Sequence, residues 1–468
     1  MKKILLSFII FAFTLLILPD GSVAKAEFLS KFTVLLKDGH QKQFIEEVEK
    51  HSLAVSYEIK ELDLYQIEGK EKDIINYLKS TDVIDSYNKS TFYTPEKSYL
   101  DVKDTVIKNR ILNNDSPSTL WPHQWDINKT TNNGRSFEIS EGSKNVVVGI
   151  VDSGIDVDHP DIKNNIVEGS INLVPQDGFN GDEPNETGDI NEVNDKTGHG
   201  TFVAGQIAAN GKLKGVAPQV GIKSYRVIGS NKSESIWIIK GIIEAAKDQV
   251  DVLNISLGEY LVQGTIKHKD GSITSNKAEI KAYKKAINFA KKNGTIVVAS
   301  SGNDSLNLDN KKEVQDYWYK NLSEGAVGFT GKLLALPAAL PGVVTVSSVG
   351  PSGELSLYSN YGMSTINISA YGGDFRLLEK YGPDSWISEN WFRNEVILGL
   401  APNGGYTYSL GTSLAAPKVS AALALVIDYK EFKNPNQTIN YLYKNGTIQG
   451  DRKQVGQGIL NVYNLLRN

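Results

Sequence analysis

Continuous apolar runs, separated by stretches with helical periodicity, dominate the chain after residue 142. An unbroken apolar run is typical of a strand buried on both faces, and alternation of such strands with helices is typical of a parallel sheet. The apolar runs cover 145–151, 222–228, 252–255, 295–299 and 343–346. The helical stretches cover 200–209, 235–247 and 278–292. The pattern predicts an α/β fold with a mostly parallel, twisted sheet and helices on both of its faces.

The segment before this region has shorter elements in a different order. Strands are predicted at 31–37, 62–67 and 83–87, and helices at 41–52 and 70–80. That order predicts a small α+β domain. Residues 96–120 are polar and rich in turn-forming side chains, which is typical of an exposed linker. We therefore divide residues 27–468 into two parts: 27–110, a small domain with its linker, and 111–468, the main domain.

The first 26 residues have the pattern of a secretory signal peptide. Lys2 and Lys3 form a basic start, residues 4–18 form an apolar run, and Ala24-Lys25-Ala26 is a cleavage site of the A-x-A type. The apolar run is short for a membrane span. We expect the mature protein to be secreted and free of the membrane.

The composition excludes several kinds of site. The absence of Cys excludes disulfides, thiolate zinc sites and cysteine nucleophiles. The net charge of -4 gives no sign of a nucleic-acid-binding surface. The glycines form neither a G-x-G-x-x-G nor a Walker pattern, which disfavours a nucleotide-binding protein. A catalytic imidazole must come from one of the six histidines, which are His40, His51, His123, His159, His199 and His268.

Four polar residues stand at strand ends and helix starts, where an open parallel sheet places its functional groups. Asp152 directly follows the first apolar run, and Asn303 follows the fourth. His199 lies between two glycines at a helix start, where the backbone can approach other groups closely. Ser413 opens a helix after a turn, where backbone N–H groups lack intrahelical partners. Taken singly, Asp152 and Asn303 are equally typical of turns, and Ser413 of an ordinary helix cap.

Taken together, the four residues predict acyl transfer. Serine is a weak nucleophile that needs a base, and a histidine base needs a carboxylate to fix its tautomer. The side-chain amide of Asn303 is of a type that donates to a developing oxyanion. His159 is a weaker candidate for the base, because it lies in a polar turn.

The motifs around these residues resemble those of the subtilisin-like serine proteases. They are VDSGIDVDHPDI with Asp152, GHGTFVAGQIAA with His199, ASSGN ending at Asn303, and GTSLAAPKV with Ser413. The order Asp, His, Ser is also that of subtilisin. The resemblance covers roughly residue 120 to the end. It implies a serine endopeptidase that works through an acyl-enzyme, with Ser413 as nucleophile, His199 as general base, Asp152 as its orienter and Asn303 as oxyanion donor.

The resemblance also implies a substrate cleft and an inhibitor. In the family, two backbone segments line a cleft in which an extended peptide binds by strand addition. They match Ser256, Leu257 and Gly258, and Ala299, Ser300, Ser301 and Gly302. Residues 27 to about 95 resemble the family's propeptide, an intramolecular chaperone and inhibitor. We expect a monomer whose chemistry requires no cofactor, with structural calcium as an option.

Within the family, two features resemble the lantibiotic leader peptidases, which cut a leader from a modified antimicrobial precursor. They are the sequence WPHQWDINKTT, which starts at Trp121, and the long insertion after Asn303. Arg110 is the last basic residue of the linker, so a preference for Arg before the cut makes Arg110–Ile111 the expected self-processing bond. A general degradative extracellular subtilisin stays open as an alternative, and an inactive protease-like binding module as a remote one.

Calcium sites are uncertain at the level of sequence. Asp161 matches a calcium ligand of many subtilisins, but the loop 209–215 is short and lacks the partner ligands. The loop from Asp177 to Asp195 holds several acids and no Lys or Arg. Its composition suits either calcium or a solvated acidic loop, and its charge suits basic residues in a substrate.

The primary specificity pocket is also open to two readings. Two charged, poorly periodic stretches, 259–277 and 303–336, are expected to be insertions at loop positions. The resemblance places Ala335 near the base of the pocket, where it brings no charge. Alternatively, an acid from the insertion enters the pocket, with Asp304 and Asp309 as the candidates.

Overall fold

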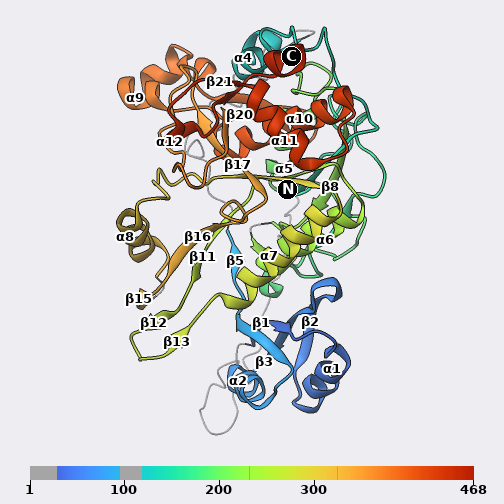
Figure 1. The fold of residues 1–468 in the computed structure, drawn as a ribbon, viewed down its shortest axis with the longest axis vertical. Helices are drawn as coiled ribbons and strands as arrows, with labels where there is room; N and C mark the ends of the chain where they lie inside the picture. The colour runs from blue at the N-terminus through green and yellow to red at the C-terminus, as the bar shows by residue number, and fades with distance from the viewer. Residues whose placement is uncertain (1–28, 95–118, 231, 324) are drawn as a thin grey trace, which may run out of the picture.

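The computed structural model describes residues 29–94, 119–230, 232–323 and 325–468. The predicted signal peptide, nearly all of the predicted linker and the Arg110–Ile111 bond lie outside the described residues. Figure 1 shows two units of unequal size, with the smaller N-terminal unit at one end of the molecule.

A large sheet forms the centre of the main unit, in the order β21-β22-β18-β17-β14-β10-β6-β8-β7. Neighbouring strands are parallel, except for the antiparallel edge pair β21 and β22. The strands are β6 (Val147–Asp152), β7 (Ile171–Asn172), β8 (Gly221–Arg226), β10 (Val252–Ile255), β14 (Ile296–Ser300), β17 (Val343–Val349), β18 (Ile368–Tyr371), β21 (Thr447–Ile448) and β22 (Ile459–Leu460). The predicted fold class is confirmed, and the five apolar runs are strands within it.

Helices cover both faces of this sheet, as the alternating pattern predicts (Figure 1). The helices α5 (His199–Ala208) and α10 (Thr412–Lys430) share a core with Val148 and Ile150. The helices α6 (Ser235–Lys247) and α7 (Lys277–Lys292) share a second core with Val151. Successive side chains of a strand point to opposite faces, so β6 supplies both cores at once.

The smaller unit is a four-stranded antiparallel sheet with two helices on one face. Its order is β2-β3-β1-β4. Its elements are β1 (Ser30–Leu36), α1 (Gln41–Lys50), β2 (Ala54–Ile59), β3 (Leu64–Gly69), α2 (Glu71–Ser80) and β4 (Ile84–Lys89). Phe44 and Ile74 belong to a core of its own, whereas Leu35, Ile59 and Leu64 join the core of α6 and α7. The free face of the small sheet therefore packs on the main unit. Sequence analysis missed β2, because most of its side chains are exposed or half-buried and the apolar signal is weak.

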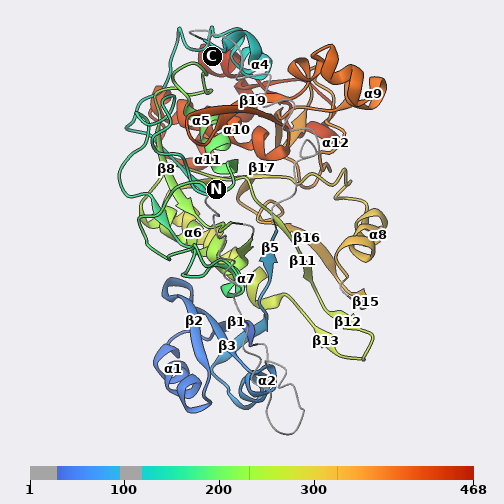
Figure 2. The same ribbon diagram turned by 180° about the vertical axis from the view of Figure 1, so that it is seen from behind.

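The two expected loop insertions pair with each other and form a β-arm. Their strands were not predicted, because the partner strands lie on separate insertions and local periodicity does not record such pairing. β11 pairs with β16, and β12 lies between β13 and β15 (Figure 2). The arm consists of β11 (Glu259–Gln263), β12 (Ile266–His268), β13 (Ile273–Thr274), α8 (Lys311–Asn321), β15 (Ala326–Phe329) and β16 (Lys332–Leu336).

Shorter elements complete the main unit. β5 (Phe92–Tyr93), which follows the small sheet, pairs antiparallel with β9 (Ser233–Glu234). The others are α4 (Trp125–Thr131), α9 (Arg376–Ser388), β19 (Ile397–Ala401), β20 (Gly405–Ser409), α11 (Pro435–Asn445), α12 (Arg452–Val455) and α13 (Val462–Arg467). None of the helices in the described ranges is long and apolar enough to span a bilayer.

Candidate active site

The end of β6 brings Asp152 against His199. Asp152 is fully buried, and its Oδ1 accepts hydrogen bonds from His199 Nδ1 at 2.8 Å and from the Ser153 amide at 2.8 Å. The His199 side chain opens α5 and is about one-third exposed. A buried carboxylate therefore orients an imidazole whose other edge is accessible.

Asp195 holds the turn that carries His199. Its Oδ1 accepts from the amides of Thr197 and Gly198, and its Oδ2 accepts from the amide of Thr201. These bonds satisfy backbone donors that a helix start leaves without intrahelical partners. Sequence analysis counted Asp195 only as one acid of a loop. The available signal was its place four residues before His199.

Gly200 allows this turn to approach the end of β6. A Cβ at this position would lie 2.1 Å from the carbonyl oxygen of Gly154, a distance that no real contact has. At this close approach, the Gly200 amide donates a hydrogen bond to Ser153 Oγ at 2.9 Å. The glycine after His199 thus lets Asp152 and His199 meet.

Ser413 lies in the first turn of α10, which begins one residue earlier than predicted, at Thr412. Pro417 lies four residues further on and has no N–H, so it cannot bond to the Ser413 carbonyl. Ser256 Oγ donates to that carbonyl at 2.8 Å and in turn accepts from Asn254 Nδ2 at 2.9 Å. The side chain of Ser256, predicted as a cleft residue, thereby fixes the backbone of Ser413.

Asn303 is hydrogen-bonded through its side-chain oxygen to the same turn. Its Oδ1 accepts from the Thr412 amide at 2.9 Å and from Thr412 Oγ1 at 2.8 Å. A Cβ on Gly411 would lie 2.9 Å from Ser413 Oγ and 3.6 Å from Asn303 Nδ2. Gly411, with φ of 154°, thus leaves the space between these two polar atoms open.

A cavity of about 380 Å³ joins the predicted site residues. Its wall includes His199, Asn303 and Ser413, and Asp152 contacts it through His199. It also includes the predicted cleft residues Ser256, Leu257, Gly258, Ser300, Ser301 and Gly302. Ala299 is the exception: its side chain is fully buried in β14 and joins the core of α6 and α7.

Two acidic residues of the β-arm region, Glu259 and Asp304, line this cavity. Asp304 lines it together with Tyr260 and Ala335, and the hydroxyls of Tyr260 and Tyr317 donate to its two oxygens. Burial, together with the Asp304 charge, raises the pKa of Tyr260, so the phenol stays a donor. Asp309 lies outside the cavity wall and accepts hydrogen bonds from Ser364. Of the two predicted acids, the structure places Asp304 beside Ala335.

His159 has a structural environment. It is fully buried, its Nε2 lies 3.0 Å from the Gly405 carbonyl, and its Nδ1 accepts from the Asp161 amide. Asp161 also accepts from the Leu213 amide and from the Tyr406 hydroxyl. Asp161 therefore anchors the short loop after α5 through hydrogen bonds.

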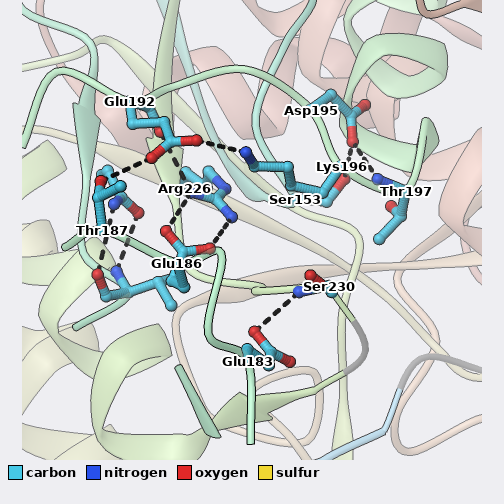
Figure 3. Close-up of polar contacts among 12 residues, drawn as sticks. Ser153, Glu183, Glu186, Thr187, Glu192, Asp195, Lys196, Thr197, Arg226 and Ser230 are labelled. Carbon is cyan, nitrogen blue, oxygen red and sulfur yellow. Dashed lines mark hydrogen bonds and ion pairs between the residues drawn. The ribbon is translucent and has the colours of Figure 1, made fainter. Parts of the chain in front are cut away.

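Several acids of the loop from Asp177 to Asp195 bond to neighbouring segments of the main unit, as Figure 3 shows. Glu186 and Arg226 form an ion pair with both side chains buried, and Glu183 accepts from the Ser230 amide. Glu192 pairs with Lys196 at the surface. The reading of a simply solvated loop is thus wrong for Glu183 and Glu186, which are buried.

Within the described ranges, no group of three or more His, Cys, Asp or Glu is placed to hold a metal ion. Structural calcium stays an untested option.

Comparisons with known proteins agree on one family. The profile of the subtilase family matches residues 143–461. The epidermin leader peptide-processing serine protease of Staphylococcus epidermidis is 40% identical over 433 residues, 91% of this chain and 91% of that protein. The nisin leader peptide-processing serine protease of Lactococcus lactis subsp. lactis is 40% identical over 349 residues, 74% of this chain and 49% of that protein.

Solved structures give the same picture. The epidermin leader peptide processing serine protease from Staphylococcus aureus matches with a TM-score of 0.81 and 38% identity, covering 94% of this chain and 98% of that one. The nisin leader peptidase from Lactococcus lactis matches with a TM-score of 0.69 and 39% identity, covering 75% of this chain and 95% of that one.

Proposed function

Because this chain belongs to the subtilase family of serine proteases, we propose that its peptide-bond hydrolysis runs through Ser413, His199, Asp152 and Asn303. Ser413 Oγ attacks the scissile carbonyl while His199 takes its proton, and Asp152 stabilises the imidazolium. Asn303 Nδ2 donates to the oxyanion of the tetrahedral intermediate. His199 then protonates the leaving amine, and water hydrolyses the acyl-enzyme. The 2.8 Å contact between Asp152 and His199 beside Ser413 carries this proposal.

The test is intact mass and N-terminal sequencing of the secreted protein, for the wild type and Ser413→Ala. We expect a wild type that starts at Ile111 and a variant that retains the preceding residues. A variant processed like the wild type would assign maturation to another protease. A Ser413→Ala protein that still hydrolyses peptides would refute the nucleophile.

We further propose that the substrate is a lantibiotic precursor, cut after a basic residue at the end of its leader. The relatives that process epidermin and nisin leaders support the substrate class. Asp304 supports the basic residue, because it offers a carboxylate in the cavity that holds Ser413, and among the described residues it forms no ion pair. Its two tyrosine donors hold it in place without neutralising its charge.

Paired peptides that differ only in the residue before the cut test this preference. Asp304→Asn is expected to lower kcat/KM for an Arg peptide on the order of 10²-fold, and to change that for a Leu peptide little, since one partner of a buried charge pair is lost. Asp309→Asn is the matched control, because Asp309 lies outside the cavity. An unchanged Arg-to-Leu ratio in Asp304→Asn would overturn the assignment. Efficient cleavage of casein would instead favour the alternative of a general degradative subtilisin.

The small unit is proposed to act as an inhibitory propeptide of an exported monomer. β5 continues from that unit and adds a strand to β9, and Tyr93 lines the cavity. An extended substrate would bind by the same kind of strand addition. Since Tyr93 lines the cavity that holds Ser413, the unit and a substrate would compete for the space of that cavity. Faster peptide hydrolysis after removal of residues 27–110 from purified protein, with re-inhibition by the added fragment, is the expected result.

A further inference from the structure

Buried carboxylates of the main unit lie under the small unit, which supplies many of their hydrogen-bond donors. Glu279 of α7 is fully buried, and it accepts from Thr33 Oγ1 at 2.8 Å, from the Thr91 amide at 2.9 Å and from Asn88 Nδ2. All three donors belong to residues 29–94. None of them carries a positive charge.

Glu259, the first residue of β11, lies beside Glu279 and is also buried. Its Oε2 accepts from Thr91 Oγ1 at 3.1 Å and from Ser235 Oγ at 2.8 Å, and its Oε1 accepts from Tyr283 Oη at 2.7 Å. Two acids thus share one site with neutral donors. Like charges so close disfavour ionisation of both groups.

The cations at this interface serve other acids. Lys31 pairs with Glu234 at 2.6 Å, and Glu234 also accepts from Gln66 Nε2. At the rim, Lys281 pairs with Asp85, and Lys240 and Lys247 pair with Glu61. Among the described residues, neither Glu259 nor Glu279 forms an ion pair, so the charge of the pair is balanced only by dipoles.

We propose that Glu259 and Glu279 form a pH-dependent latch, which holds the small unit on the main unit while one of them is protonated and loosens it when that proton is lost. The consequence for activity, an opening of the cleft at alkaline pH, rests on the proposed inhibitory function. The loosening itself rests only on the interface.

The direction follows from linkage. Burial, and then the charge of Glu259, raises the pKa of Glu279 to about 8, and burial raises the pKa of Glu259. Once the small unit leaves, Glu279 faces water, and its pKa returns toward the ordinary value of about 4.3. The docked state then binds the extra proton, so docking is strongest below the free pKa. It weakens up to tenfold per pH unit until about pH 8 and levels off above it.

Backbone hydrogen exchange of the full chain carrying Ser413→Ala measures docking without any activity. We expect protection of β1 and β4, corrected for the chemical exchange rate at each pH, to fall between pH 5 and pH 8, while β10 and β14 stay protected. A flat profile for β1 and β4 would overturn the latch. Because hydrogen exchange reports docking and not hydrolysis, this result is independent of whether the proposed function holds.

Glu259→Gln gives the decisive comparison. The amide can keep its oxygen toward Thr91 and Ser235 and donate to Tyr283, and it removes the charge that opposes ionisation of Glu279. We expect stronger protection of β1 and β4 than in the parent at pH 8 to 9. A purely structural role for Glu259 predicts weaker protection at every pH, and that outcome would refute the latch. Asp85→Asn, at the rim, is the control and should leave the alkaline decline unchanged.

Discussion

Two groups of buried carboxylates in the main unit differ in the origin of their donors. The first group, Asp152, Asp195 and Glu186, bonds to groups of the main unit itself. The interface acids, Glu259 and Glu279, take donors from residues 29–94 as well. The hydrogen bonds of the first group therefore do not depend on the small unit. In the second group, Glu279 takes the donors to its side chain from the small unit, whereas Glu259 also has Ser235 and Tyr283 of the main unit.

This difference separates carboxylates that position other groups from carboxylates whose protonation depends on docking of the small unit. A carboxylate whose donors belong to one rigid body can hold a group in place, as Asp152 holds the imidazole of His199 and Asp195 holds the start of α5. A carboxylate whose donors belong to a separable unit changes its surroundings when that unit moves, so its protonation is coupled to docking. Four changes test the contrast, from the largest expected effect to the smallest.

The largest effect is expected at Asp152. Asp152→Asn replaces the acceptor for His199 Nδ1 with an amide that favours the wrong tautomer, and kcat should fall on the order of 10⁴-fold. Steady-state hydrolysis of a peptide measures this. Asp158→Asn, an exposed residue of the following turn, is the matched control. Equal losses in both variants would contradict the positioning role.

Removal of one partner of a buried ion pair should cost the most stability. Glu186→Gln leaves Arg226 buried with its charge uncompensated, and we expect a loss of about 3 to 5 kcal/mol in the free energy of unfolding. Urea unfolding of the Ser413→Ala background, followed by tryptophan fluorescence, measures the loss. Glu192→Gln, which breaks the more exposed pair with Lys196, should cost no more than about 1 kcal/mol. Similar losses of stability in Glu186→Gln and Glu192→Gln would contradict the expectation that burial sets the cost of breaking an ion pair.

The hydrogen bond from Ser256 Oγ to the Ser413 carbonyl joins two neutral groups, in contrast to the ion pair of Glu186 and Arg226. Ser256→Ala leaves a backbone carbonyl without its donor, and a loss of about 1 to 3 kcal/mol is expected. Pro417→Ala should recover part of it, because an alanine N–H four residues on can bond to the same carbonyl. The double variant compared with both single variants, by urea unfolding, gives the coupling. Strict additivity of the two changes would contradict this account.

The smallest effect is expected at the rim of the interface, with the opposite pH dependence. Burial tends to raise the pKa of Asp85, but the hydrogen bond from Lys281, with further contributions, lowers it overall. The pair stabilises docking above the ordinary pKa near 4 and loses this effect as the pH falls through the lowered pKa. Asp85→Asn should therefore weaken docking by less than about 1 kcal/mol at neutral pH. Hydrogen exchange of β4 below pH 5 should change less with pH in this variant than in the parent.

The site was accessible to sequence analysis because its signals are local. His199 sits between two glycines, and Ser413 opens a helix of small residues, so each residue is marked by its immediate neighbours. Asp195 and Ser256 were not assigned their positioning roles, because their partners lie in other elements. Ala299 was included by its place in a segment, although strand alternation turns its side chain into the core.

The fold also contains elements that local sequence patterns predict and elements that they do not. Buried parallel strands have continuous apolar runs, so most of the central sheet was predicted. The edge pair β21 and β22 and the exposed strand β2 carry too short or too weak a pattern. The β-arm escaped prediction because it forms by pairing between β11 and β16, on separate insertions.

The sequence by itself determined the family and the parallel sheet and named the candidate catalytic residues, since periodicity and short motifs act over a few residues. Only the tertiary structure decided which donors each acid receives, that Asp304 rather than Asp309 enters the cavity, and that Glu259 and Glu279 share one buried site. Those outcomes depend on contacts between distant segments, and the free energy of a buried charge is set by such contacts rather than by its neighbours in the chain.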